Sequence, residues 1–187
     1  MTPDQLSENP ARPFAEIPGL HHVGFVVQDV EQAARDWHAM TGIGPFLLFE
    51  HLPFDEVLLD GAPVTFDHSA AFAAWGDNFV ELQVLHRVEP AAARAHFEPS
   101  GPNALSHLAI AVDDRVGTSD RIARRGVPCA VQAYNGPLAI SQHAPTASLG
   151  FALEVHQRGD FLDGFFRAVA KAAQNWDGAQ LVIPTSM

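Results

Sequence analysis

Two histidines and two glutamates recur at matching places along this chain. His22 and His107 open two similar stretches, HVGFVVQD and HLAIAVDD, at an offset of 107 − 22 = 85 residues. Glu81 and Glu154 each lie inside an apolar run, FVELQ and ALEVH. A carboxylate buried in such a run is costly unless it is paired or bound to a metal. Together the four side chains predict one site for a divalent cation, built from two histidines and two carboxylates.

The alternation of side chains along a strand indicates what surrounds Glu81. Val80 and Leu82 share one face by period two, which leaves Phe79, Glu81 and Gln83 on the other. We expect that second face to line a cavity. Each histidine then lies beside the glutamate of its own half, provided that the first and last strands of each half are neighbours.

His21 is the rival of His22 for the first ligand position. Adjacent residues of a strand point to opposite faces, so only one of the two can enter the cavity. His22 is favoured because it aligns with His107, whereas His21 aligns with Ser106.

Several further residues are candidates for a substrate pocket, although a structural role is the alternative for each. Most of the 10 histidines and 13 phenylalanines are expected to be structural. Four other histidines could approach the cleft, and His143, in the third strand of the second half, is the first to test. These four are His51, His68, His143 and His156. The predicted pocket residues are Gln83, His143, Phe46 and Phe79.

The elements that must position these residues form a duplicated unit. Strand, helix and three strands are predicted in each half, so the fold class is α+β, with two βαβββ modules that form a curved mixed β-sheet cleft. A C-terminal helix with an apolar stripe is expected to pack on the outside of the sheet. The predicted divisions are an irregular arm (1–18), a first module (19–86), a linker (87–103), a second module (104–158), and a C-terminal helix and tail (159–187).

The amino-acid composition excludes several classes of binding partner. The formal net charge is -11 with only 11 Lys+Arg, which argues against nucleic acid, anionic membranes and a tightly clamped coenzyme A or glutathione. Cys129 is the only cysteine, so no disulfide framework or thiolate cluster is expected. The first residues do not resemble a signal peptide, and no apolar run is long enough to span a bilayer. We therefore expect a soluble, cytoplasmic protein with a small-molecule substrate.

The four fragments LHHVGFVVQDV, FVELQVL, LSHLAIAVDD and SLGFALEVHQ resemble the vicinal oxygen chelate superfamily of glyoxalases, bleomycin-resistance proteins and extradiol dioxygenases. The resemblance covers roughly residues 19–158. It implies one divalent metal (Zn, Mn, Co, Ni or Fe) between two βαβββ modules, with His22, Glu81, His107 and Glu154 as ligands. This sequence has a possible metal ligand at all four positions, and in this it resembles the glyoxalase I and methylmalonyl-CoA epimerase group. Modules of this fold pair within a chain or across a homodimer, and we expect one site per chain.

The resemblance implies a metal-dependent isomerase, epimerase or lyase that acts through a metal-stabilised enediolate, with Glu154 as the base and Glu81 as its partner for the reverse step. The many phenylalanines favour an apolar or aromatic oxygenated substrate, as in a catabolic enzyme. One alternative is a non-haem iron ring-cleaving dioxygenase that uses both histidines and one glutamate. Another alternative is a non-catalytic protein that binds a hydrophobic ligand.

Overall fold

Two βαβββ modules join edge to edge in one 11-stranded sheet of a computed structural model that describes residues 19–186. The first module comprises β1 (Leu20–Val26), α2 (Val30–Thr41), β2 (Phe46–Phe49), β5 (Thr65–Trp75) and β6 (Asn78–Glu89). The second comprises β7 (Ala104–Val112), α4 (Arg115–Ala123), β8 (Cys129–Asn135), β9 (Leu138–His143) and β10 (Ala152–Gln157). This architecture confirms the predicted α+β fold, while the arm predicted over 1–18 lies outside the described residues.

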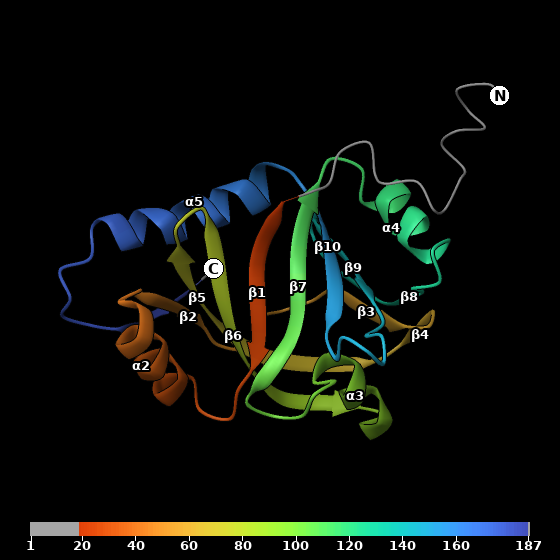
Figure 1. Cartoon of the computed structure of the whole chain (residues 1–187), viewed down its shortest axis with the longest axis horizontal. Helices are drawn as coiled ribbons and strands as arrows, with labels where there is room; N and C mark the ends of the chain where they lie inside the picture. Colours follow the sequence, from red (N-terminus) through yellow and green to blue (C-terminus); the bar gives the residue numbers. More distant parts are fainter. Residues whose placement is uncertain (1–18, 187) are drawn as a thin grey trace.

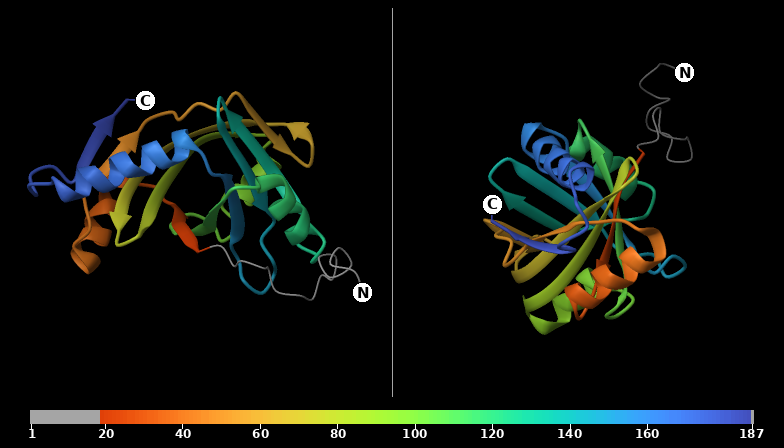
Figure 2. Two further views of the ribbon diagram at one scale, coloured as in Figure 1. Left: turned by 90° about the horizontal axis from the view of Figure 1, so that it is seen from above. Right: turned by 90° about the vertical axis from the view of Figure 1, so that its left-hand side faces the viewer.

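The strand order explains how the two modules meet. It runs β11-β2-β5-β6-β1-β7-β10-β9-β8-β3-β4, where β3 is Glu56–Leu59, β4 is Ala62–Pro63 and β11 is Val182–Thr185. In each module the first and last strands are parallel neighbours, β1 with β6 and β7 with β10. The modules are joined by the antiparallel pair β1 and β7 at the centre of the sheet (Figure 1). The sheet curves into an arch whose inner side is seen in Figure 2.

Local sequence signals fix where the two module helices begin. Asp29 caps α2, since its carboxylate accepts a hydrogen bond of 3.0 Å from the backbone N–H of Gln32. Asp114 caps α4 in the same way, through the N–H of Gly117 at 2.9 Å. Helix α2 ends at Gly42, which adopts the left-handed conformation with φ 77. Each helix therefore starts directly after the first strand of its module.

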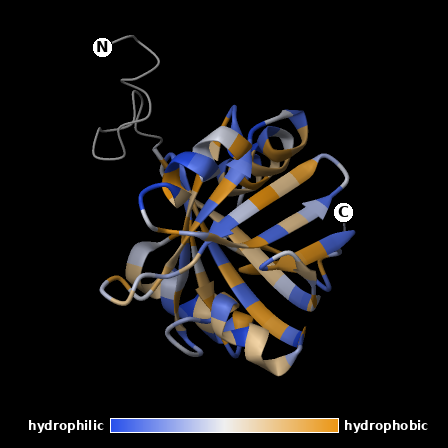
Figure 3. Cartoon of the chain, turned by 90° about the vertical axis from the view of Figure 1, so that its right-hand side faces the viewer, coloured by the Kyte–Doolittle hydropathy of each residue, from blue (hydrophilic) through white to orange (hydrophobic). Residues whose placement is uncertain are grey.

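Helices α2 and α4 cover the outer face of the sheet. Val30 and Ala34 of α2 pack against Val80 and Leu82, the residues that flank Glu81. The alternation of hydrophobic and hydrophilic residues along strands is visible in Figure 3. Because Val80 and Leu82 turn outward to this core, Glu81 must turn inward.

The C-terminal helix α5 (Asp160–Gln174) occupies the inner face, so the expectation that it packs outside the sheet was wrong (Figure 2). Its residues Leu162, Phe166 and Val169 form a core with Phe72 of β5 and Ala111 of β7. The apolar stripe was read correctly, but a stripe fits either face of a sheet. The inner face is the one left uncovered by α2 and α4.

A hairpin inserted into the first module crosses to the second. Asp60 and Gly61 form the tight turn between β3 and β4, with φ 49 and φ 79. Strand β3 then pairs antiparallel with β8. The strand between this hairpin and β6, which belongs to the first module itself, is the alanine-rich β5.

The linker carries structure of its own. Strand β6 extends to Glu89, and the short helices η1 (Ala91–Ala93) and α3 (Arg94–Phe97) follow it. Phe97 is buried in a core with Val57 of β3. Within residues 19–186, no helix has the length and apolar character needed to cross a membrane.

Candidate metal centre

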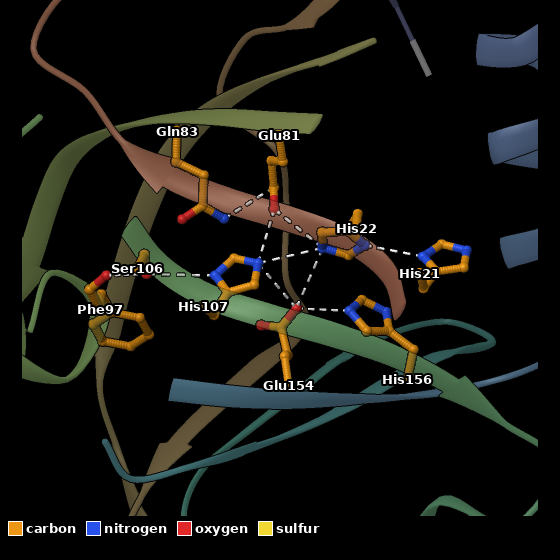
Figure 4. Close-up of polar contacts among 9 residues, drawn as sticks. All are labelled: His21, His22, Glu81, Gln83, Phe97, Ser106, His107, Glu154 and His156. Carbon is orange, nitrogen blue, oxygen red and sulfur yellow. Dashed lines mark hydrogen bonds and ion pairs between the residues drawn. The ribbon is translucent and has the colours of Figure 1, made fainter. Parts of the chain in front are cut away.

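His22, Glu81, His107 and Glu154 converge at the centre of the sheet on its inner face (Figure 4). Nε2 of His22 lies 3.4 Å from Oε2 of Glu81 and 3.8 Å from Oε2 of Glu154. Nε2 of His107 lies 3.2 Å and 3.6 Å from the same two oxygens, and the two Nε2 atoms are 3.3 Å apart. All four residues come from one chain, two from each module, so a single chain supplies the whole set.

The spacing of these four atoms fits a shared cation. Ligand atoms that surround one ion tetrahedrally at about 2.0–2.2 Å lie roughly 3.3–3.6 Å from one another. The separations of 3.2–3.8 Å fall around this range. His22, Glu81 and His107 also form a group of ligand atoms compact enough to hold a metal ion. A divalent ion would be held by these residues.

The outer ring nitrogen, Nδ1, of each histidine has a polar partner. Nδ1 of His107 lies 3.4 Å from Oγ of Ser106, whose hydroxyl donates to the backbone carbonyl of Phe97 at 2.5 Å. The serine oxygen can therefore accept a hydrogen bond from Nδ1 of His107. Nδ1 of His22 lies 3.0 Å from Nδ1 of His21 in the corresponding place. When Nδ1 of each ring donates to its partner, Nε2 keeps a free lone pair, as a metal ligand requires.

Each glutamate is supported by the residue two positions later on its own strand. Nε2 of Gln83 donates to Oε1 of Glu81 at 2.9 Å. Nε2 of His156 lies 2.6 Å from Oε2 of Glu154. The offset 154 − 81 = 73 equals 156 − 83, so the duplication repeats these supporting residues as well as the ligands. Such contacts orient carboxylate ligands.

The ionised carboxylates of the site favour a bound cation. Burial raises the pKa of Glu81, but hydrogen bonds from His107 and His22 outweigh it and hold that pKa well below the usual range. Burial likewise raises the pKa of Glu154, yet the charges of His107 and His156 bring it to about 2. Burial lowers the pKa of His22, whereas the carboxylates overcome burial at His107 and raise its pKa to about 9. Two ionised carboxylates thus draw a proton into the site, where a divalent cation would supply the same compensation.

A bulge in β1 places both His21 and His22 near the centre. The register passes from Leu20 opposite Ile110 to His22 opposite Ala109, which leaves His21 as the extra residue. Of the two, only His22 lines the cavity, as predicted. The His21 ring instead contacts Phe166 of α5, with ring centroids 4.4 Å apart.

A cavity of about 110 Å³ extends from the four ligands along the inner face of the sheet. Gln83, Gln142 and His156 lie near its metal end, and among residues 19–186 no lysine or arginine lines it. Most of its wall is aromatic or aliphatic. Aromatic side chains come from the segment between β2 and β3, from β5, from the linker and from α5, namely Phe54, Phe66, Phe72, Phe97, Phe161, Phe165 and Phe166.

Three of the predicted pocket residues lie elsewhere. His143 is fully buried, but its ring contacts Oγ of Ser119 in α4 and the carbonyl oxygen of Val127, so it lies on the outer face and the pocket prediction does not hold. Phe46 is buried in the outer core under α2. Phe79 shares the inner face with Glu81 but packs on Phe166 outside the cavity.

Gln83 does line the cavity, and the sequence did not single out most of the other residues that do. His68 and His156, two of the four histidines considered, line it, whereas His51 is exposed at the surface. The period of two along FVELQ and ALEVH was a signal for His156, because it places His156 on the same face as Glu154. The aromatic residues of α5 and the linker gave no comparable signal.

Residues 21–140 match the model of the Glyoxalase/Bleomycin resistance protein/Dioxygenase superfamily. The chain belongs to this superfamily. This agrees with the fragments from which the relationship was predicted, and with the paired modules that place the four side chains. Superfamily membership establishes neither the substrate nor the metal.

Solved structures give the same picture of the fold. Methylmalonyl-CoA epimerase from Mycobacterium tuberculosis is 18% identical, with a TM-score of 0.54 over 83% of this chain and 98% of that chain. A hypothetical protein from Bacillus halodurans is 16% identical, with a TM-score of 0.50 over 78% of this chain and 97% of that one. Among curated proteins no match was found. At these identities the likeness supports the fold alone.

Proposed function

We propose that the chain is a divalent-metal-dependent isomerase, epimerase or lyase for a small, mostly apolar or aromatic, oxygenated substrate. The observation that carries this proposal is the meeting of both glutamates and both histidines at one end of a cavity. A divalent ion held there would supply Lewis acidity for two neighbouring substrate oxygens. Membership of a superfamily that contains glyoxalases supports the same reaction class.

The cavity wall favours an uncharged, apolar body for the substrate. Within the described part of the chain no lysine or arginine lines the cavity, so these residues offer a phosphate or a glutathione carboxylate no cationic partner. The structural neighbour named as a methylmalonyl-CoA epimerase is only 18% identical and gives no reason to assign coenzyme A to this chain. The aromatic side chains of α5 and the linker would instead enclose rings or alkyl groups.

Glu154 is the carboxylate we assign as base. Its side chain is 14% exposed, against 6% for Glu81, so it is the more accessible of the two to a substrate in the cavity. Its lowered pKa keeps it ionised at neutral pH, as proton abstraction requires. Glu81, held by Gln83, is the carboxylate we assign as the base for the reverse step.

The base assignment predicts a specific loss. Glu154→Gln preserves the size of the side chain but removes proton acceptance, and turnover on a genuine substrate should fall by about 100-fold or more. The measurement is kcat with the metal content of each preparation determined in parallel. Full turnover by a metal-loaded Glu154→Gln variant would show that another group takes the proton.

Elemental analysis of the purified protein tests the metal centre directly. About one equivalent of a transition metal or zinc is expected per chain, and Glu81→Ala and His107→Ala should each lose it. His51→Ala is the matched control, because His51 is an exposed histidine outside the cavity. If the protein binds no divalent metal after reconstitution, the proposed reaction class fails and a non-catalytic ligand-binding role takes its place.

A second reaction class has one observation in its favour. Two groups of three ligand atoms are each compact enough to hold a metal ion, His22 with Glu81 and His107, and His22 with Glu154 and His156. Two histidines and one carboxylate are the set used by non-haem iron oxygenases. Iron in the purified protein together with oxygen uptake on catechols would favour this dioxygenase, whereas an isomerase consumes no oxygen.

A further inference from the structure

The end of the cavity away from the metal ligands contains one buried polar ring. His68 lies on β5, is 2% exposed and lines the cavity. It lies in a row of aromatic rings, stacked on Phe54 with centroids 5.6 Å apart and tilted against Phe66 at 4.5 Å. Phe66 in turn stacks on Phe97 of α3 at 4.2 Å. Strand β5, the segment between β2 and β3, and the linker helix α3 therefore meet around this histidine.

Nδ1 of His68 is buried and has no hydrogen-bond partner within residues 19–186. Leaving a buried polar atom unpaired is destabilising, and a phenylalanine would fit an aromatic row without that cost. Burial lowers the pKa of His68 to about 4, so its ring is neutral at physiological pH. A neutral imidazole carries one donor and one acceptor, and either can serve a hydroxyl or a carbonyl group.

The strand register sets the distance between the two ends of the cavity. Phe72 lies opposite Glu81, Ala70 opposite Gln83, and His68 opposite Leu85, so these residues share the inner face. Leu85 is four residues beyond Glu81, which corresponds to roughly 13 Å along a strand. The backbone positions of Glu81 and of the residue opposite His68 are thus separated by about the length of an extended two-ring molecule.

We propose that His68 is the specificity-determining residue of the cavity, and that it hydrogen-bonds a second hydroxyl or carbonyl group of an elongated, uncharged substrate. The proposal deepens the proposed function and rests on it for the position of the substrate's reacting end. The substrate class is then a two-ring aromatic or alicyclic compound with vicinal oxygens at one end. Its second polar group would lie on the order of 10 Å from those oxygens.

Two probes of similar shape test this contact: 2-naphthol, which can hydrogen-bond His68, and 2-fluoronaphthalene, which cannot donate a hydrogen bond. Their affinities for the full-length protein are measured with and without bound zinc. We expect 2-naphthol to bind about 10-fold more tightly in both states, the value of about one hydrogen bond. In His68→Phe the ratio should fall to near one, with the affinity for 2-fluoronaphthalene unchanged.

Three controls separate this contact from other effects. His51→Phe makes the same substitution outside the cavity and should keep the 10-fold ratio. His68→Gln restores a hydrogen-bonding group and should recover part of it. In wild-type protein labelled with ¹⁵N-histidine, 2-naphthol should shift the ring nitrogen resonances of His68, which needs no variant to fold.

The proposal is overturned if wild type binds 2-naphthol and 2-fluoronaphthalene with about equal affinity, or if His68→Phe keeps the full preference for 2-naphthol. Failure of both probes to bind wild type overturns it as well. A preference for 2-naphthol that appears only with zinc and survives in His68→Phe would place the hydroxyl at the metal. Because the measurement without zinc needs no metal, a protein that proved unable to bind metal would refute the reaction class and still leave the His68 contact tested.

Discussion

Gly24 allows the His107 ring to lie directly over strand β1. Gly24 is opposite Glu81 on one side and His107 on the other. A Cβ atom added at Gly24 would lie 2.1 Å from Cε1 of His107 and 2.3 Å from Nε2. Carbon atoms in favourable contact are about 3.5–4.0 Å apart, so in Gly24→Ala the ring would have to move by about 1.4 Å.

A shift of that size should break the metal centre. Histidine ligands lie about 2.0–2.1 Å from zinc with a tolerance of about 0.2 Å, several times smaller than the required movement. His107 is 1% exposed, so its surroundings leave little room to turn the ring and restore Nε2. We expect Gly24→Ala to weaken zinc binding by about 100-fold or more, since even loss of an outer support costs about 10–100-fold.

Competition with a chromophoric chelator measures this affinity, and urea unfolding of each variant checks that the protein is folded. Gly19→Ala is the matched control, because, its chain neighbours aside, no atom of the described residues 19–186 lies within 4 Å of a Cβ at Gly19. The second module has Ala109 at the equivalent position (24 + 85), where a Cβ is already tolerated beside His22. Wild-type zinc affinity in a folded Gly24→Ala protein would refute the role of the His107 position in metal binding.

Two further outcomes are expected. His156→Leu and Gln83→Leu should each lower zinc affinity by about 10–100-fold, because each removes the hydrogen bond that orients a carboxylate ligand; unchanged affinity in both would count against this support. His68 has its pKa lowered from 6.5 to about 4 in the folded protein, so its contribution to stability is complete above pH 6.5 and is lost as the pH falls towards 4. Replacing it in His68→Phe should therefore reduce the acid-induced loss of unfolding free energy by about 2 kcal/mol at pH 5, measured by urea unfolding at pH 7 and 5; equal losses in both proteins would contradict the buried, neutral state of this ring.

The sequence by itself determined the fold class and predicted that the four candidate ligands lie at one site. This was possible because the duplication repeats each histidine and glutamate in a strand whose alternation is visible locally. Neighbouring first and last strands then place His22 by Glu81 and His107 by Glu154, and a symmetric pairing of two modules brings the pairs together. Local periodicity was sufficient for these residues because their geometry depends on strands that pair in a known order.

Only the tertiary structure decided which other residues border the cavity. Gln142 and His143 are adjacent on β9, and the register that sets Gln142 opposite Glu154 is what turns Gln142 inward and His143 outward. The apolar stripe of α5 fits either face of the sheet, and its place on the inner face depends on the outer face being covered already. Phe66 of β5 contacts both His68 and Phe97 of the linker helix α3, and the contact with Phe97 joins distant parts of the chain that no local pattern encodes. Strand periodicity sets the chemistry that is repeated in both halves, whereas long-range packing shapes the cavity that would select a substrate.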